Sequence, residues 1–224
     1  MITAASNSRI KRLVQLNQKS KLRRTEDVFL AEGVKMFLEA PREQLQEVYV
    51  SESFLEKCSC REHLEEVGYE VVSDSVFSKI SDTCTPQGVL CVLKQFHYNI
   101  EEMLRDKAPL FLLLENIQDP GNLGTMLRTG EGAGVSGIIM SRDTVDLYNP
   151  KVIRSTMGSI YRVPFYYVED FAAAVHQVQQ AGVSVYAAHL RGKNSYACQD
   201  YTKGTAFLIG NEGNGLREET AELA

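Results

Sequence analysis

The sequence predicts an α/β protein with a small N-terminal module followed by a larger C-terminal module. Two observations carry this prediction. Short apolar runs alternate with helical patterns along both modules, and in the second module a glycine-rich loop directly follows an apolar run twice. Because parallel strands end at the same edge of a sheet, the two loops should lie together there. Such an edge suits a nucleotide-like ligand and an anionic polymer.

The first module, residues 26–95, has the alternation of a compact α/β domain. The sequence before it, 1–25, is expected to form a basic helix or arm, and 96–108 a linker. Strands are predicted at 28–31, 45–50, 69–72 and 88–93. Helices are predicted at 34–40, 53–67 and 76–81.

The second module, residues 109–224, is expected to have a mostly parallel sheet, since helices separate its strands. Its ligand should bind beyond the carboxyl edge of that sheet. Strands are predicted at 110–114, 136–140, 163–168, 183–188 and 205–210. Helices are predicted at 122–133, 149–157, 170–181 and from 215 onward.

The composition excludes several classes of protein. A hydrophobic content of 44% and a charged content of 24% are ordinary for a globular domain. No apolar run is long enough to span a membrane, and the N-terminus lacks the apolar core of a secretory signal. Five cysteines, an odd number, suit a reducing cytoplasm. Cys58 and Cys60 lack a second ligand pair at usable spacing, so no metal site is expected.

The distribution of charge matters more than the formal net charge of −5. Seven of the 24 basic residues and none of the 29 acidic residues lie within 1–25. A basic arm on an acidic body suggests contact with phosphate, and a solvated helix face is the alternative. The bases are Arg9, Lys11, Arg12, Lys19, Lys21, Arg23 and Arg24.

The first glycine-rich loop, Asp119-Pro-Gly-Asn-Leu-Gly124, follows the run Leu110-Phe-Leu-Leu-Leu114. Its proline and glycine are expected to break the strand, and Asn122 to cap a helix that runs to about Ala133. Arg128, six residues later, is expected near the N-terminal end of that helix, where backbone N–H groups and the helix dipole favour anions. The alternative is a simple cap and a surface arginine.

The second loop, Gly210-Asn-Glu-Gly-Asn-Gly215, has three glycines that allow backbone to approach a ligand closely. It lacks the Lys-Ser/Thr pair of a phosphate-binding P-loop. Glu212 is either a cap for the following helix or a functional carboxylate.

A third segment opens a helix with Asn149-Pro150. Lys151 and Arg154 lie one turn apart and could clamp phosphate, although an ordinary exposed basic face has the same pattern. His189 is expected to be structural rather than catalytic.

Taken in order, three motifs resemble the SpoU (TrmH) family of RNA ribose 2′-O-methyltransferases, within the SPOUT superfamily. The match covers about 109–220, and the first module is similar to the family's N-terminal RNA-binding domain. The motifs are Asn116-x-x-Asp119-Pro-Gly-Asn122-x-Gly124-x-x-x-Arg128-Thr, the segment Asn149-Pro150 to Arg154-Ser155, and Leu208-Ile-Gly-Asn-Glu212-Gly-x-Gly215-Leu. Val28-Phe-Leu-Ala-Glu32-Gly33 and Pro86-Gln87-Gly88-Val89 carry the N-terminal match.

The resemblance implies a trefoil-knotted α/β fold and methyl transfer from S-adenosylmethionine to a ribose 2′-hydroxyl, by a homodimer acting on ribosomal or transfer RNA. Ribosomal RNA is the favoured substrate, and the cysteine usage favours a cytoplasmic location. The family's catalytic residues map onto Asn122, Arg128 and Glu212. Its cofactor-binding positions map onto Gly210, with Ile209 and Leu208 beside it. The RNA-binding residues are expected to be Arg9, Lys11, Arg12, Arg23, Arg24, Lys151 and Arg154.

Arg128 is expected to stabilise developing negative charge on the sugar oxygen, because a guanidinium is very hard to deprotonate and is therefore a poor base. Asn122 would orient Arg128 or the ribose. Glu212 would either fix the loop or anchor Arg128.

The family's third motif, an apolar-Pro-Met stretch followed by Ser-Leu-Asn, is absent from the 224 residues. The expected consequence is an incomplete cofactor pocket and an inactive chain. A rival function is an RNA-binding protein with a degenerate, non-catalytic methyltransferase fold. A dinucleotide-dependent oxidoreductase is disfavoured because the chain lacks that class's glycine fingerprint.

Overall fold

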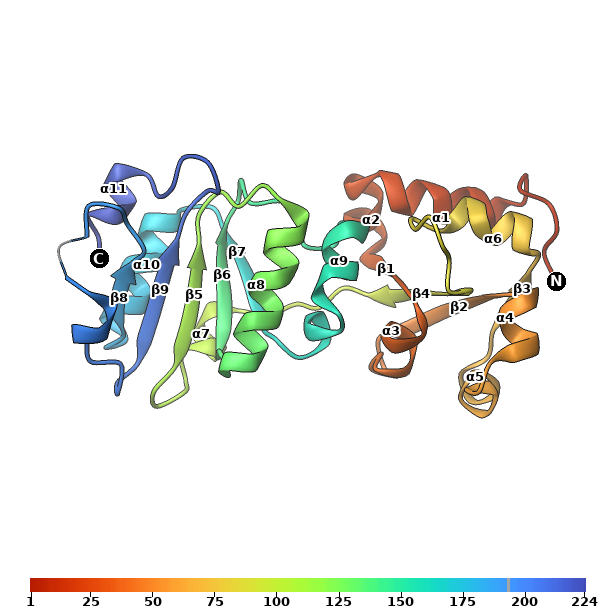
Figure 1. Ribbon diagram of the computed structural model, residues 1–224, viewed down its shortest axis with the longest axis horizontal. Helices are drawn as coiled ribbons and strands as arrows, with labels where there is room; N and C mark the ends of the chain where they lie inside the picture. The colour runs from red at the N-terminus through yellow and green to blue at the C-terminus, as the bar shows by residue number, and fades with distance from the viewer. Residues whose placement is uncertain (193) are drawn as a thin grey trace. The chain divides into compact units, whose positions relative to one another are not determined.

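The structure is a computed structural model that describes residues 1–192 and 194–224. Its contacts divide the chain into two compact units. The first consists of Met1–Phe96 with Asp146–Tyr161, and the second of His97–Val145 with Arg162–Ala224. Each unit is built around its own sheet (Figure 1).

The first unit contains a four-stranded sheet in the order β1-β4-β2-β3. Strand β4 runs antiparallel to both β1 and β2, whereas β2 and β3 are parallel. Each predicted strand of this module is present within one residue of its expected ends. The strands are β1 (Val28–Glu32), β2 (Leu45–Ser51), β3 (Glu70–Val72) and β4 (Val89–Lys94).

Helices cover both faces of this first sheet (Figure 1). The predicted helix 53–67 is wrong in one respect: it is two helices, because Cys58 adopts an extended conformation with φ −70° and ψ 136°. On one face lie α1 (Ser8–Gln18), α2 (Ser20–Glu26) and α6 (Asp74–Ile80). On the other lie α3 (Val34–Leu38), α4 (Glu52–Lys57) and α5 (Arg61–Val67).

The basic N-terminal segment is an integral part of this unit. Ile10, Leu13 and Leu16 of α1 are at most 1% exposed and pack into the core beneath β1 and α6. Helical spacing of these apolar residues was visible in the sequence, but the depth of their burial was not.

A segment that the sequence analysis placed in the second module packs on the first unit. Helix α9 (Pro150–Thr156) lies against β1. The Tyr148 ring lies 4.9 Å from the ring of Phe29, and the Tyr161 hydroxyl, in the 3₁₀ turn η1 (Ser159–Tyr161), donates to the Met36 carbonyl at 3.0 Å.

The second unit contains a five-stranded parallel sheet in the order β7-β6-β5-β9-β8. This confirms the predicted parallel sheet. Its strands are β5 (Leu110–Leu114), β6 (Gly137–Ser141), β7 (Phe165–Val168), β8 (Ser184–Ala187) and β9 (Thr205–Ile209). Its helices are α7 (Ile100–Met103), α8 (Pro120–Ala133), α10 (Phe171–Gln180), α11 (Glu218–Ala221) and the 3₁₀ turn η2 (Tyr196–Cys198).

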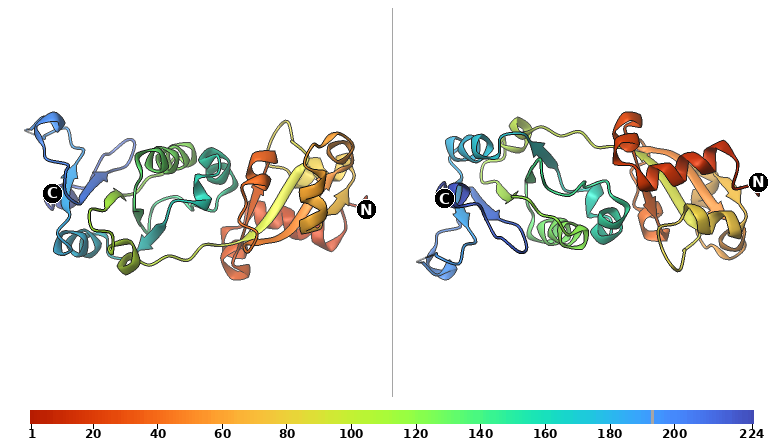
Figure 2. Two further views of the ribbon diagram at one scale, coloured as in Figure 1. Left: turned by 90° about the horizontal axis from the view of Figure 1, so that it is seen from below. Right: turned by 90° about the horizontal axis from the view of Figure 1, so that it is seen from above.

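Helix α8 covers one face of this sheet and α7 and α10 cover the other (Figure 2). Helix α7 lies inside the segment predicted as a linker; it is ordered because Ile100 and Met103 join the core with the apolar face of α10. Within the described residues, no helix is long and apolar enough to cross a membrane.

The strand order creates a switch point at the centre of the second sheet. From β5 the chain moves outward to β6 and β7, then crosses to the opposite edge and returns through β8 to β9, beside β5. In open parallel sheets, ligands bind beyond the carboxyl ends of the strands at such a point. Both glycine-rich loops follow these two adjacent strands.

Candidate functional site

Helix α8 begins immediately after the β5 loop. Asp119, not Asn122, is its N-cap: the Asp119 carboxylate accepts the backbone N–H of Asn122 at 2.8 Å, and Pro120 occupies the first turn. The predicted cap was therefore wrong by three residues. The correction frees the Asn122 side chain for another contact.

The loop after β9 closes on itself. Asn211 and Gly215 exchange backbone hydrogen bonds of 3.0 and 2.9 Å, and the Asn211 side-chain oxygen accepts the N–H groups of Gly213 and Asn214. Gly210 packs so tightly on this turn that a Cβ there would lie 2.2 Å from the Gly215 carbonyl carbon. Only glycine fits at this position.

Glu212 joins the two loops. Its carboxylate accepts the backbone N–H groups of Asp119 at 2.9 Å and Gln118 at 3.1 Å, and the side-chain amide of Asn122 at 3.2 Å. Desolvation opposes ionisation of this carboxyl, but these hydrogen bonds outweigh it and hold the pKa of Glu212 below its ordinary value. Two roles were expected for Glu212, to fix the loop or to anchor Arg128, and these contacts support the first.

The side chains of Asn116, Gln118 and Asn211 also belong to this cluster, although the sequence analysis gave them no role in the site. The Asn211 amide donates to the Asn116 carbonyl at 2.8 Å, and the Gln118 amide donates to the Asn116 side chain at 2.7 Å and to the Asp143 carbonyl at 2.6 Å. Asn116 itself has φ +55°. The available signal was the run of amide side chains in both loops, which exceeds what a simple turn needs.

Arg128 does not join this cluster. It lies on α8 six residues beyond Asn122, which places it about 9 Å further along the helix axis and about 240° around it. The expected position near the N-terminal end of the helix is therefore wrong. Its side chain is exposed, and Glu212 accepts its hydrogen bonds from Gln118, Asp119, Asn122 and Asn211 instead.

The predicted cofactor positions differ in accessibility. Leu208 is fully buried and packs in the core, so its side chain is not available to a ligand. Ile209 and Gly210 are partly exposed. Within the described residues, neither the N–H nor the C=O group of Gly210 has a backbone partner.

Arg23, one of the predicted RNA-binding residues, is buried. Its side chain is 3% exposed, pairs with Asp146 at 2.6 Å and donates to the Leu16 carbonyl at 2.7 Å. A cation in this position holds α1, α2 and the segment before α9 together and cannot reach RNA. This corrects the expected RNA contact.

The remaining bases of the N-terminal segment fall into two groups. Arg9 pairs with Glu70, and Arg12 pairs with both Glu26 and Glu47 at 2.7 Å, so these two guanidinium groups are already engaged. Lys11, Lys19, Lys21 and Arg24 are exposed. The sequence shows the number of cations, but the partners of each depend on the fold.

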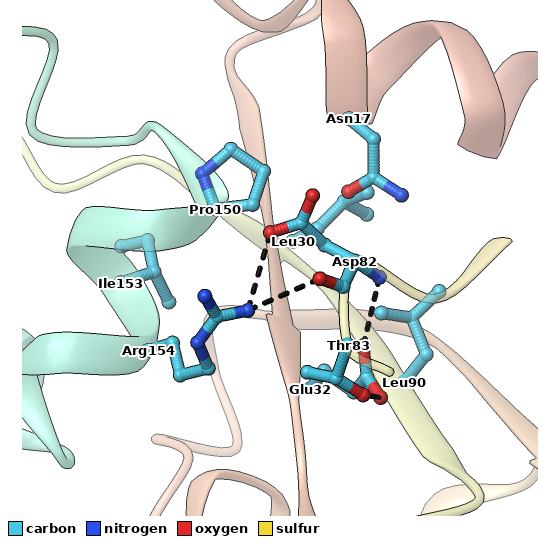
Figure 3. A pocket seen from close by; sticks show the side chains of 9 residues that line it. All are labelled: Asn17, Leu30, Glu32, Asp82, Thr83, Leu90, Pro150, Ile153 and Arg154. Atoms are coloured by element: carbon cyan, nitrogen blue, oxygen red, sulfur yellow. Dashed lines mark hydrogen bonds and ion pairs between the residues drawn. The ribbon is translucent and has the colours of Figure 1, made fainter. Parts of the chain in front are cut away.

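Lys151 and Arg154 belong to α9, on the first unit. Lys151 is exposed, whereas Arg154 donates to both the backbone carbonyl and the carboxylate of Asp82 at 3.2 Å (Figure 3). The pair does not form the free phosphate clamp that the spacing suggested. Within the described residues, no group of His, Cys, Asp or Glu side chains could hold a metal ion.

The comparisons with known proteins divide the chain in the same order as the sequence analysis. Residues 109–224 match the model of the SpoU rRNA Methylase family, and residues 7–91 match that of the MRM3-like substrate binding domain. A curated relative, the 23S rRNA (guanosine(2553)-2′-O)-methyltransferase RlmP of Bacillus subtilis, is 31% identical over 218 residues, which cover 96% of this chain and 84% of the relative.

Solved structures show the same likeness. A crystal structure of an rRNA methyltransferase from Sinorhizobium meliloti has a TM-score of 0.82 and 30% identity, covering 100% of this chain and 86% of that one. An AdoMet-bound rRNA methyltransferase structure from the same organism has a TM-score of 0.82 and 29% identity, with coverage of 99% and 84%.

Proposed function

Because the chain belongs to the SpoU rRNA methylase family, we propose that it transfers a methyl group from S-adenosylmethionine to the 2′-hydroxyl of a ribose in ribosomal RNA. The observation that supports this most directly is the contact of Glu212 with Asn122 and the start of α8. It joins the two family motifs at the switch point of the sheet, where a ligand would bind.

The residues at the end of β9 fit a cofactor with a polar heterocycle. The partly exposed Gly210 has N–H and C=O groups without a backbone partner in the described residues, and Ile209 beside it has a partly exposed apolar side chain. The bound cofactor would supply a methyl group on a positively charged sulfonium. Ile209, Gly210 and the loop that follows would hold it, with Glu212 fixing that loop against α8.

Catalysis then depends on alignment and on activation of the hydroxyl. Alignment of the two reactants can contribute roughly 7–11 kcal/mol. A sugar hydroxyl is a weak acid, so a cation beside its oxygen lowers the cost of developing negative charge, and one well-placed donor contributes about 3–4 kcal/mol. We assign this role to Arg128, whose exposed guanidinium could also contact a neighbouring phosphate. Asn122 would orient the ribose.

The substrate is proposed to be a loop nucleotide of ribosomal RNA rather than transfer RNA, since sequence-specific RNA recognition targets unpaired bases. Two relatives are named as 23S rRNA methyltransferases, which supports this choice. In this proposal, residues 26–95 form the substrate-binding domain and 109–224 the methyltransferase domain. The protein acts as a homodimer in the cytoplasm.

The test is a methylation assay with labelled S-adenosylmethionine and bulk ribosomal RNA, using the chain extended by the family's third motif, followed by mapping of the modified nucleotide. Label incorporated into ribose 2′-oxygens is the expected result. RNA binding without any incorporation would instead support the rival function, a non-catalytic RNA-binding protein.

A further inference from the structure

Glu115 is a buried carboxylate at the end of β5, directly before the first loop. Its side chain is 1% exposed. Removing a carboxylate from water is costly unless it is paired and hydrogen-bonded. Its surroundings therefore show what this charge does.

All of its side-chain partners come from the segment that leaves the glycine-rich loop. The carboxylate accepts the backbone N–H of Arg217 at 2.8 Å, the Thr220 hydroxyl at 2.6 Å and the Arg217 guanidinium at 3.4 Å. These bonds fix the start of α11. The loop is thus held at its exit by Glu115, in its middle by Glu212 and at its beginning by the β9 ladder.

Arg217 extends the connection to a third strand. Its guanidinium also pairs with Asp143, which follows β6. Asp143 accepts a hydrogen bond from the Ser141 hydroxyl, and that hydroxyl in turn accepts the Asn116 backbone N–H at 2.8 Å. The chain of contacts therefore returns to the residue next to Glu115, and it links the ends of β5 and β6 with the loop after β9.

Glu115, Arg217 and Asp143 with their bridging residues form a polar ring, in which the pKa values of Asp143 and Arg217 are both shifted toward the charged form. Desolvation opposes ionisation of Asp143, but its bonds from Ser141 and Arg217 together hold the pKa of that carboxyl below its ordinary value. The hydrogen bond to Asp143 raises the pKa of Arg217. None of the three side chains is used in the methyl-transfer chemistry assigned above.

A role in stability alone would not require these charges, since replacing a buried ion pair with apolar side chains of similar volume is often neutral or stabilising. A polar ring instead fixes one geometry for the segments that it joins. Here those segments are the two loops that carry Asn122, Gly210 and Glu212.

We propose that Glu115, Arg217 and Asp143 are positioning residues that fix the loop from Gly210 to Leu216 in the geometry that binds the cofactor. The inference rests on the proposed function, because it assigns the cofactor to that loop. It predicts that breaking the ring weakens cofactor binding while leaving RNA binding unchanged.

The test measures S-adenosylmethionine binding by calorimetry for the chain extended by the family's third motif and for Glu115→Gln, Arg217→Gln and Asp143→Asn in the same background. At least a tenfold increase in Kd is expected for each, and Arg217→Lys should recover part of the loss. The Kd for ribosomal RNA should change less than twofold. Amide hydrogen exchange should become faster at residues 210–217, with or without cofactor.

The matched control is Glu169→Gln, which breaks the exposed Arg142–Glu169 pair in the same unit. It should change neither the Kd for cofactor nor the exchange. Asp143→Asn keeps the test valid if Glu115→Gln fails to fold, because the Asp143 side chain is 42% exposed.

Three results separate the possible failures. Unchanged cofactor Kd and unchanged exchange in the folded variants would overturn the positioning role while leaving the proposed function intact. A fall in thermal stability with unchanged cofactor Kd would show that the ring is merely structural. If the extended wild-type chain neither binds cofactor nor methylates RNA, the proposed function and this inference both fall.

Discussion

At the residue scale, Glu212 contributes most to the geometry of the site. A carboxylate can accept four donors with two oxygens, as Glu212 does from Asp119, Gln118, Asn122 and Asn211. An isosteric amide has only one accepting oxygen, and its NH₂ group would face a backbone N–H. The position therefore requires an ionised acid rather than a residue of similar shape.

This requirement predicts how stability depends on pH. Because the folded protein holds the pKa of Glu212 below its ordinary value, its contribution is fully present above the unfolded pKa of about 4.3 and is lost as the pH falls through the folded value. Urea denaturation at pH 7, 5 and 3 should show a larger loss of stability below pH 5 for the wild type than for Glu212→Gln. Parallel curves for the two proteins would contradict this.

The sequence could predict that Asn122 and Glu212 lie at the same edge of the sheet, because each follows a strand in a glycine-rich loop, and the structure brings them into contact. It could not identify their partners. Asp119 took the cap expected of Asn122, since a proline at the first helical position favours the preceding residue as cap. Arg23 looked like any other base of the N-terminal segment, and only the packing of α1 and α2 shows that it is buried.

At the element scale, the close approach between the end of β9 and its loop depends on a glycine. Gly210→Ala would put a methyl group 2.2 Å from the backbone of Gly215, so the loop must open. We expect a loss of about 1–3 kcal/mol in unfolding free energy and a loss of cofactor binding. Chemical denaturation and calorimetry measure these two effects.

Gly132→Ala is the matched control, since a Cβ there meets nothing within 4 Å and the residue lies inside α8. That substitution should stabilise the protein by about 0.5–1 kcal/mol, because alanine has the higher helix propensity. If both variants behaved alike, the close approach at Gly210 would not be what fixes the loop.

Helices and strands were predictable where the spacing of apolar residues along the sequence has one clear pattern. Strands such as β1 and β5 are continuous apolar runs, and their ends were correct within one residue. The break between α4 and α5 was not visible, because helix propensity does not report the extended conformation of Cys58. Helix α7 was missed because a four-residue helix is too short to show a period.

At the scale of the whole molecule, the excess of positive charge in residues 1–25 survives the burial of Arg23. Lys11, Lys21 and Arg24 are exposed on α1 and α2. We expect the replacement of all three residues by Gln to make RNA binding less sensitive to salt. The negative slope of log K against log salt should become shallower by about 2, since each lost phosphate contact removes about 0.7 for single strands. Filter binding across a salt series measures it.

Substitutions rather than a deletion are needed, because α1 carries core residues such as Leu13 and Leu16. The control replaces three exposed lysines elsewhere in the first unit, Lys57, Lys79 and Lys94, and so removes the same charge. An equal change of slope in both variants would mean that net charge, not the N-terminal helices, determines the salt dependence.

The position of α9 could not be predicted from sequence, because a short amphipathic helix does not show which sheet it packs on. It lies against β1 and carries Arg154 to Asp82. The parallel direction of the strands in the second sheet, by contrast, was predictable, because helices separate them, whereas their order β7-β6-β5-β9-β8 came only from the structure. That order brings the loops after β5 and β9 side by side.

The central claim is that the exposed Arg128 guanidinium activates the sugar hydroxyl. The most direct measurement is the single-turnover rate of methyl transfer by Arg128→Ala at saturating RNA and cofactor, with Arg142→Ala as a control for the loss of an exposed cation. The account predicts a rate lower by about 10²–10³-fold, with RNA affinity within a few-fold of wild type. A rate close to that of the wild type would contradict it.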